Sequence, residues 1–134
     1  MNQSASLENQ AGHRFDGVLE KMAQGIRRAL PAATCAVHHG RNEDFPWWVV
    51  ARFTYGEKEA KSVDVSVECQ RRNGVLWLRA DVARESGYVL SEFPASEQTL
   101  ARAEESADSW LEERLKQIEE FLLNQVPAIT RELT

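Results

Sequence analysis

The sequence predicts an α+β fold in which an antiparallel β-meander is flanked by one helix at each end of the domain. Apolar residues recur at helical spacing near both ends of the chain, whereas the segments between them alternate apolar and polar residues. Between two alternating segments stands Asn73-Gly74, a strong signal for a tight hairpin. We therefore expect the order α-β-β-β-β-β-α, with both helices packed on one face of the sheet.

Size and composition fit one globular domain. The chain has 134 residues and is 43% hydrophobic, which is enough to form a core without disulfides. We expect a flexible polar tail at residues 1–12 and a single α+β domain at residues 13–134. The start of the chain lacks the features of a signal peptide, and no apolar run approaches 18 residues. We therefore expect a cytoplasmic protein without membrane contact.

The N-terminal helix and the first two strands follow from local patterns. Residues 14–30 place their apolar side chains on one helical stripe, and Pro31 ends that helix. A short strand is expected at residues 34–38, with its place at the sheet edge left open. Residues 47–55 are rich in β-branched and aromatic side chains, which favour a second strand.

The hairpin turn sets a register for the central strands, residues 62–70 and 75–84. A two-residue turn at 73–74 places Val67 opposite Ala80 and Glu68 opposite Arg79. Pairing Val63 with Phe53 then aligns the preceding strand. One face of these strands is apolar, so we expect both helices to cover that face.

A last short strand at residues 88–93 and a long helix complete the predicted fold. Pro94 is expected to stop the sheet, and Ser96 to cap a helix that runs to about Asn124. The inner stripe of this helix comprises Leu100, Ala103, Ala107, Trp110, Leu111, Leu115, Ile118 and Leu122. Its outer side carries the acids Glu105, Asp108, Glu112, Glu113, Glu119 and Glu120, which we interpret as a solvated surface.

The sheet face away from the helices is the predicted recognition surface. Tryptophan and arginine side chains carry much of the binding energy in protein interfaces. The strand alignment gathers such residues on this face, and Phe93 is expected to join them beside Arg79. The predicted partner-binding residues are Trp48, Val50, Arg52, Trp77, Arg79 and Phe93.

Charge and motifs exclude several other functions. The net charge is −5, and the whole excess falls in residues 94–134, with four Lys/Arg against nine Asp/Glu. Nucleic-acid binders need a basic surface, so we expect no nucleic acid. The adjacent His38 and His39, near Glu43 and Asp44, should point to opposite faces of a strand, so we expect no metal site.

No catalytic motif is present either. There is no glycine-rich phosphate loop and no nucleophile motif, and Cys35 and Cys69 fall on the core face. We therefore expect no enzyme activity and no cofactor.

A protein-binding role follows: a small acidic adaptor, chaperone-like or immunity-like protein with a protein partner, expected to be a homodimer. In size, acidity and helix–meander–helix order the chain resembles small bacterial secretion chaperones and toxin-immunity proteins, which implies the binding of a protein. The alternative is a small-molecule binder with a pocket between the sheet and the C-terminal helix. That pocket would be lined by Trp47, Trp110 and Arg114.

Overall fold

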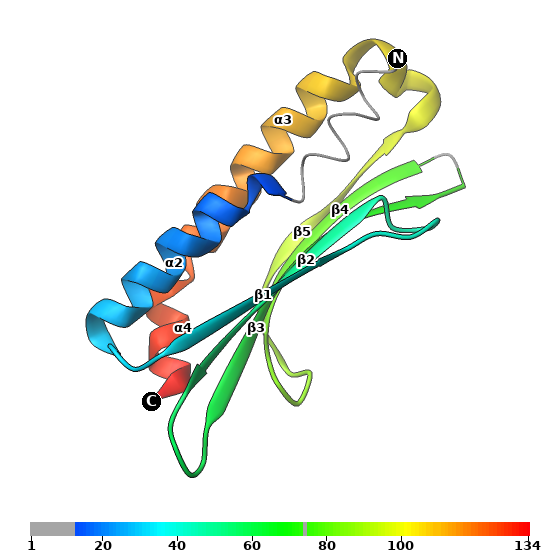
Figure 1. Cartoon of the computed structure of the whole chain (residues 1–134). Coiled ribbons are helices and arrows are strands. Elements are labelled where there is room, and N and C mark those ends of the chain that lie inside the picture. The colour runs from blue at the N-terminus through cyan, green and yellow to red at the C-terminus, as the bar shows by residue number, and fades with distance from the viewer. Residues whose placement is uncertain (1–12, 74) are drawn as a thin grey trace.

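The structure is a computed structural model that describes residues 13–73 and 75–134, with only the backbone for residues 94–108. Its elements are α2 (Asp16–Ala29), β1 (Thr34–Gly40), β2 (Trp47–Tyr55), β3 (Lys61–Arg72), β4 (Val75–Arg84), β5 (Val89–Thr99), α3 (Leu100–Asn124) and α4 (Val126–Leu133). Figure 1 shows the helices gathered on one side of a five-stranded sheet. The predicted α+β meander is confirmed, while the tail predicted at residues 1–12 lies outside the described residues.

The five strands lie in chain order and every neighbouring pair is antiparallel. Val67 pairs with Ala80, Glu68 with Arg79, and Val63 with Phe53, so both predicted registers are confirmed. The pattern of β3 explains why they hold. Its valines at 63, 65 and 67 are at most 1% exposed, and a one-residue slip would turn all three to the opposite face.

Strand β5 is longer than predicted, and Pro94 does not end it. The strand continues to Thr99 and α3 begins at Leu100, so the predicted stop at Pro94 and the cap at Ser96 are wrong. Two local features accommodate the proline. β5 is an edge strand, and its register with β4 shifts at this point, where Ala80 pairs with Phe93 but Leu78 with Ser96. A proline at an edge bulge removes no ladder hydrogen bond that the sheet needs.

Strand β1 also extends further than predicted and joins the sheet as the opposite edge. It continues to Gly40 and pairs along its whole length with β2. His39 pairs with Val49, which is buried under the helices, so His39 belongs to the helix face of the sheet. His38 pairs with Val50 and belongs to the other face. The predicted divergence of these two histidines is confirmed.

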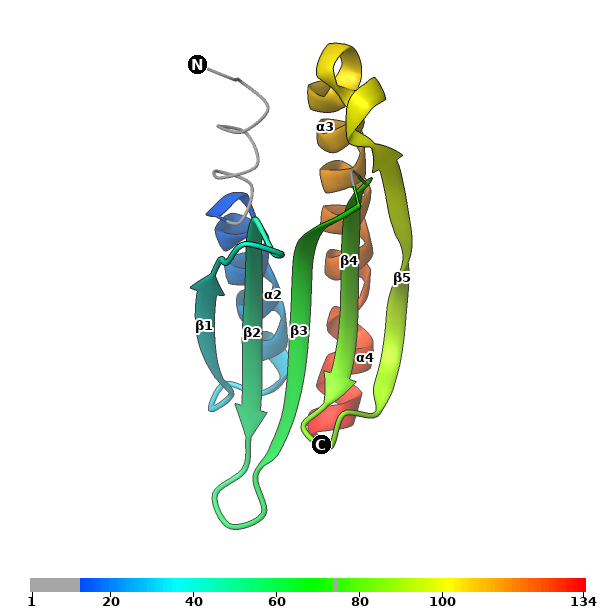
Figure 2. The same ribbon diagram turned by 90° about the vertical axis from the view of Figure 1, so that its right-hand side faces the viewer.

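The core lies between the apolar face of the sheet and the three helices. Viewed from the uncovered side, α2 lies behind β1, β2 and β3, and α3 lies behind β4 (Figure 2). Leu111, Leu115, Ile118 and Leu122 of the predicted inner stripe are buried, and Trp110 is half-buried. The side chains of Leu100, Ala103 and Ala107 lie outside the described residues. No helix in the described part of the chain is long and apolar enough to span a bilayer.

The short helix α4 was not predicted from the sequence. It packs against α2, α3 and β3 and buries Ile129 and Leu133 completely or nearly so. Its proline lies in the first turn, where the missing amide hydrogen is not needed. Burying each of these two side chains contributes about 1.5–3 kcal/mol. Only eight residues long, the helix depends on this packing for its stability.

An ion-pair network joins the two ends of the chain across the helix layer. Just before α2, Arg14 donates hydrogen bonds to Glu112 and, over 2.6 Å, to Glu119 on α3. These two acids of the predicted solvated side of α3 are thus paired with Arg14, although 41% and 27% of their side chains stay exposed. The hydrogen bond from Arg14 lowers the pKa of Glu112 below its ordinary value. Part of the stabilisation by Arg14 is therefore lost when Glu112 is protonated.

Replacing Arg14 with glutamine is expected to lower the free energy of unfolding by about 0.5–1 kcal/mol at neutral pH, since the pair is partly exposed. The pKa of Glu112 is depressed in the folded state, so its contribution is present above the unfolded-state pKa and is lost as the pH falls. The part of the difference that comes from Glu112 should therefore shrink progressively as the pH falls below about 4.3. Urea unfolding across pH measures it. Arg28→Gln, which removes an exposed charge from α2, is the control, and an equal loss there would contradict the network's role.

Candidate functional site

The candidate site is the outer face, defined as the sheet face away from the helices. Helices α2, α3 and α4 all lie on the other side, and no described element covers the outer face (Figures 1 and 2). Trp48 of β2 lies in one cross-strand row with Glu68 and Arg79, and Trp77 lies in the neighbouring row opposite Gln70. Both indoles are partly exposed. The structure therefore places Trp48, Val50, Arg52, Trp77 and Arg79 together on this face.

A glycine on β1 determines where the Trp48 indole lies. A Cβ atom at Gly40 would stand 2.1 Å from Cζ2 of Trp48, so the ring rests directly over the backbone of this edge strand. Any larger residue at position 40 would displace it. Beside the ring lies the outer hollow, which has a volume of about 280 Å³. It is lined by Asn42, Phe45, Trp48, Val50, Ser66, Val67 and Glu68.

Charged side chains surround these aromatic residues. Arg52 donates two hydrogen bonds to Asp64, of 2.8 and 3.0 Å. Arg79 lies 3.8 Å from Glu68 and 3.6 Å from Glu92. With Asp81, the described outer-face side chains of β2 to β5 comprise four acids, Asp64, Glu68, Asp81 and Glu92, and three arginines, Arg52, Arg72 and Arg79. The outer face therefore keeps a small net negative charge.

Asp81 is the outer-face acid whose titration the fold changes most clearly. Burial raises its pKa, Arg79 opposes that rise, and the negative charges of Glu68, Glu92 and Asp64 add to it. A half-buried carboxylate among other acids is strained electrostatically. A cation from a binding partner would relieve that strain, so Asp81 marks the point where the outer face most favours positive charge.

Phe93 does not belong to the outer face, and its predicted placement beside Arg79 is wrong. It pairs with Ala80, which is buried under the helices. Its ring also packs edge-on against Phe121 of α3, with centroids 5.7 Å apart. The reason is the register shift next to Pro94, which changes the face alternation along β5. The alternation within residues 88–93 alone carries no sign of that shift.

None of the hollows described in this structure brings together the three residues predicted for the alternative pocket. Trp47 is 3% exposed and packs against Phe15 with ring centroids 5.9 Å apart. Arg114 instead donates a 2.9 Å hydrogen bond to Gln117 on its own helix. Trp110 packs half-buried against the core. The hollow that Trp47 lines, described below, includes neither Trp110 nor Arg114.

A histidine cluster at the end of β1 was missed in the sequence. Asp16 lies 2.7 Å from Nε2 of His39 and 3.4 Å from Nδ1 of His13, and the two imidazoles stack with centroids 4.6 Å apart. These side chains come from the start of α2 and from β1, so their separation along the chain hides the cluster. Among the described residues they form the group that could hold a metal ion, in place of His38 and Asp44.

The two cysteines offer little thiolate chemistry. Cys35 and Cys69 both belong to the helix face, through pairing with Phe53 and Trp47 of β2. Burial raises the pKa of the Cys35 thiol above its ordinary value, and Cys69 is completely buried. A thiol with a raised pKa is a weak nucleophile at neutral pH.

Replacing Asp81 with asparagine is expected to stabilise the protein at neutral pH, by about 0.5 kcal/mol at most because the side chain is only partly buried. The folded-state pKa is raised, so folding favours the protonated acid and stability falls as pH rises through it. The gain should therefore disappear in acid. Chemical unfolding at neutral and acidic pH measures it. Asp64→Asn breaks the ion pair with Arg52 and should lower the free energy of unfolding. If both variants changed that free energy in the same direction, the expectation would be contradicted.

Neither chelator nor zinc is expected to shift the melting temperature by more than about 1 °C, because the Asp16 carboxylate is already engaged by both imidazoles. Binding to the native state alone would raise that temperature measurably. Differential scanning fluorimetry with EDTA and with a slight excess of zinc is the measurement. A rise of several degrees that His39→Ala abolishes would establish a zinc site at this cluster.

Comparison with known proteins gives no match: no family model, no curated protein and no solved structure resembles this chain significantly. Any functional conclusion therefore depends on the geometry of the outer face and of the sheet edges. Fold alone does not assign an activity, because unrelated functions share the same architectures.

Proposed function

We propose that this protein is a non-catalytic binding module that recognises another protein through its outer face. The observation that carries this proposal is the combination of an uncovered sheet face with two partly exposed indoles among charged side chains. Large apolar groups on an exposed surface commonly mark an interface. Tryptophan and arginine are the residues whose truncation most often costs binding energy.

The outer hollow beside Trp48 supplies the place where a partner side chain would insert. Hot spots form where a partner side chain fills a pocket and excludes water. Val50 and the Trp48 ring provide apolar contact there, while Asn42, Ser66 and Glu68 provide polar groups at the rim. Because Gly40 and β1 support the indole from below, the hollow is formed before a partner arrives.

The acid excess supports a partner with a basic surface. Four acids against three arginines leave the face slightly negative, and Asp81 is the carboxylate with least compensation. Complementary charge steers association and selects the correct partner. Arg52 and Arg79 each pair with acids of this face.

The expected homodimer stays a prediction, and it would show a distinct dependence of self-association on salt. A two-fold interface would place the same negative face against itself. Added salt would then strengthen self-association by screening repulsion, whereas it would weaken binding to a basic partner. The molecular mass measured by sedimentation at low and at high salt distinguishes a second copy of this chain from a basic partner protein.

Truncating both indoles, with Trp48→Ala and Trp77→Ala together, is expected to abolish self-association and partner capture while the fold is kept. Loss of one interface tryptophan commonly costs 2 kcal/mol or more in affinity. Sedimentation measures self-association. Partner capture is measured with purified protein on a resin exposed to lysate, followed by salt elution and identification of the bound proteins. Circular dichroism and the melting temperature report whether the fold survives.

The matched control is Tyr88→Ala, which removes another aromatic ring that is 62% exposed but lies in the β4–β5 connection. It should leave capture unchanged. If the double tryptophan variant folds normally and still captures the same proteins with the same salt dependence, the outer face is not the recognition surface. Loss of capture in the Tyr88 variant alone would place the interface at the β4–β5 connection instead.

A further inference from the structure

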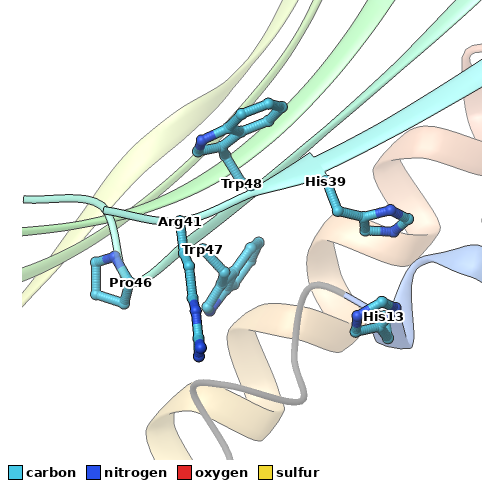
Figure 3. Close-up of a pocket in the computed structure, with 7 residues that line it drawn as sticks. His13, His39, Arg41, Pro46, Trp47 and Trp48 are labelled. Atoms are coloured by element: carbon cyan, nitrogen blue, oxygen red, sulfur yellow. The ribbon is translucent and has the colours of Figure 1, made fainter. Parts of the chain in front are cut away.

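A second hollow, which we call the edge hollow, lies at the end of the sheet where β1 turns into β2. Its volume is about 240 Å³. It is lined by His39 of β1 and by Arg41, the residue after that strand. Trp47 and Trp48 of β2 and the preceding Pro46 also line it, together with His13, which lies just before α2. Figure 3 shows the Arg41 and Trp47 side chains on one side and the two imidazoles on the other. This hollow is separate from the outer hollow, with which it shares only Trp48.

Trp47 supplies an unpaired donor at this hollow. Its side chain is 3% exposed, and its indole Nε1–H has no hydrogen-bond acceptor among the described residues. Buried hydrogen-bond donors nearly always have an acceptor, and a buried donor without one destabilises the fold by about 1–3 kcal/mol. An acceptor brought by a ligand would remove that cost.

Arg41 supplies an unpaired cation at the same place. No described carboxylate lies within ion-pair distance of its guanidinium, although other arginines of the described chain, such as Arg14, Arg52, Arg79 and Arg84, are each paired. A guanidinium presents two parallel N–H donors that match the two oxygens of a carboxylate. The hollow thus combines an unpaired cation with an unpaired neutral donor.

We propose that the edge hollow binds a small organic monocarboxylate. Its carboxylate would accept hydrogen bonds from Arg41 and from Nε1 of Trp47, and its carbon skeleton would pack against Pro46. The Arg41 side chain is exposed and long, so it can turn towards a carboxylate in the hollow that it lines with Trp47. The site is independent of the proposed protein-binding role of the outer face.

The surroundings favour a singly charged ligand over phosphate. Arg41 is the unpaired cation at the hollow, and the Asp16 carboxylate beside His13 and His39 adds negative charge nearby. The chain as a whole carries a net charge of −5. A dianion would meet more repulsion here than a carboxylate. The small volume likewise suits a ligand smaller than a typical drug.

The test uses benzoate as the probe and the indole N–H signals of the ¹⁵N-labelled full-length protein as the readout. Four tryptophans give four such signals, and the Trp47 signal is assigned by elimination with Trp48→Phe, Trp77→Phe and Trp110→Phe. Benzoate should shift the Trp47 signal in a saturable way. Benzamide, which has the same ring without the charge, and inorganic phosphate should each bind at least tenfold more weakly.

Arg41→Gln should weaken benzoate binding about tenfold or more, since a charge-assisted hydrogen-bond pair is lost. Arg28→Gln, an exposed arginine on α2, is the matched control and should bind benzoate as wild type does. Three results would each overturn the proposal. These are an unmoved Trp47 signal at saturating benzoate, equal binding of benzoate and benzamide, and an Arg41→Gln affinity equal to that of wild type. Binding of phosphate but not benzoate would assign the hollow to another anion class.

Discussion

The valine face of β3 is the constraint on which the rest of the structure depends. Strand β3 is central, and its residues 63, 65, 67 and 69 are all buried. A two-fold side-chain alternation makes the register an all-or-none choice, because a slip of one residue would expose every valine at once. The same face requires an apolar cover, which α2, α3 and α4 provide together. The outer face stays free as a consequence of this one-sided packing.

Both candidate sites are consequences of that arrangement rather than additions to it. Trp47 and Trp48 are adjacent in β2 and therefore point to opposite faces. Trp47 enters the core with a donor that the core does not satisfy, while Trp48 rests over Gly40 at the border of both hollows. A single dipeptide thus connects the helix-covered interior, the sheet edge and the outer face. A buried polar group that lacks a hydrogen bond in an otherwise well-packed fold indicates a candidate ligand-binding site.

The structure departs from the sequence-based predictions where long-range contacts override local signals. Pro94 is a strong local stop, but an edge bulge tolerates it and turns Phe93 inward towards Phe121. The acids of α3 form a solvated pattern by themselves, yet Arg14, about a hundred residues earlier, binds two of them. Helix α4 is too short for its pattern to be decisive, and its stability comes from packing against α2, α3 and β3.

The sequence by itself determined the order and registers of the central strands, the identity of the buried sheet face and the outer-face positions of Trp48, Val50, Arg52, Trp77 and Arg79. These properties depend on residue alternation and on one turn, which are local and periodic. Only the tertiary structure decided the sheet edges, the course of β5 past Pro94, and the meeting of His13 and Asp16 with His39 and of Arg41 with Trp47. Such contacts arise when separate elements pack together, and no pattern within one element encodes them.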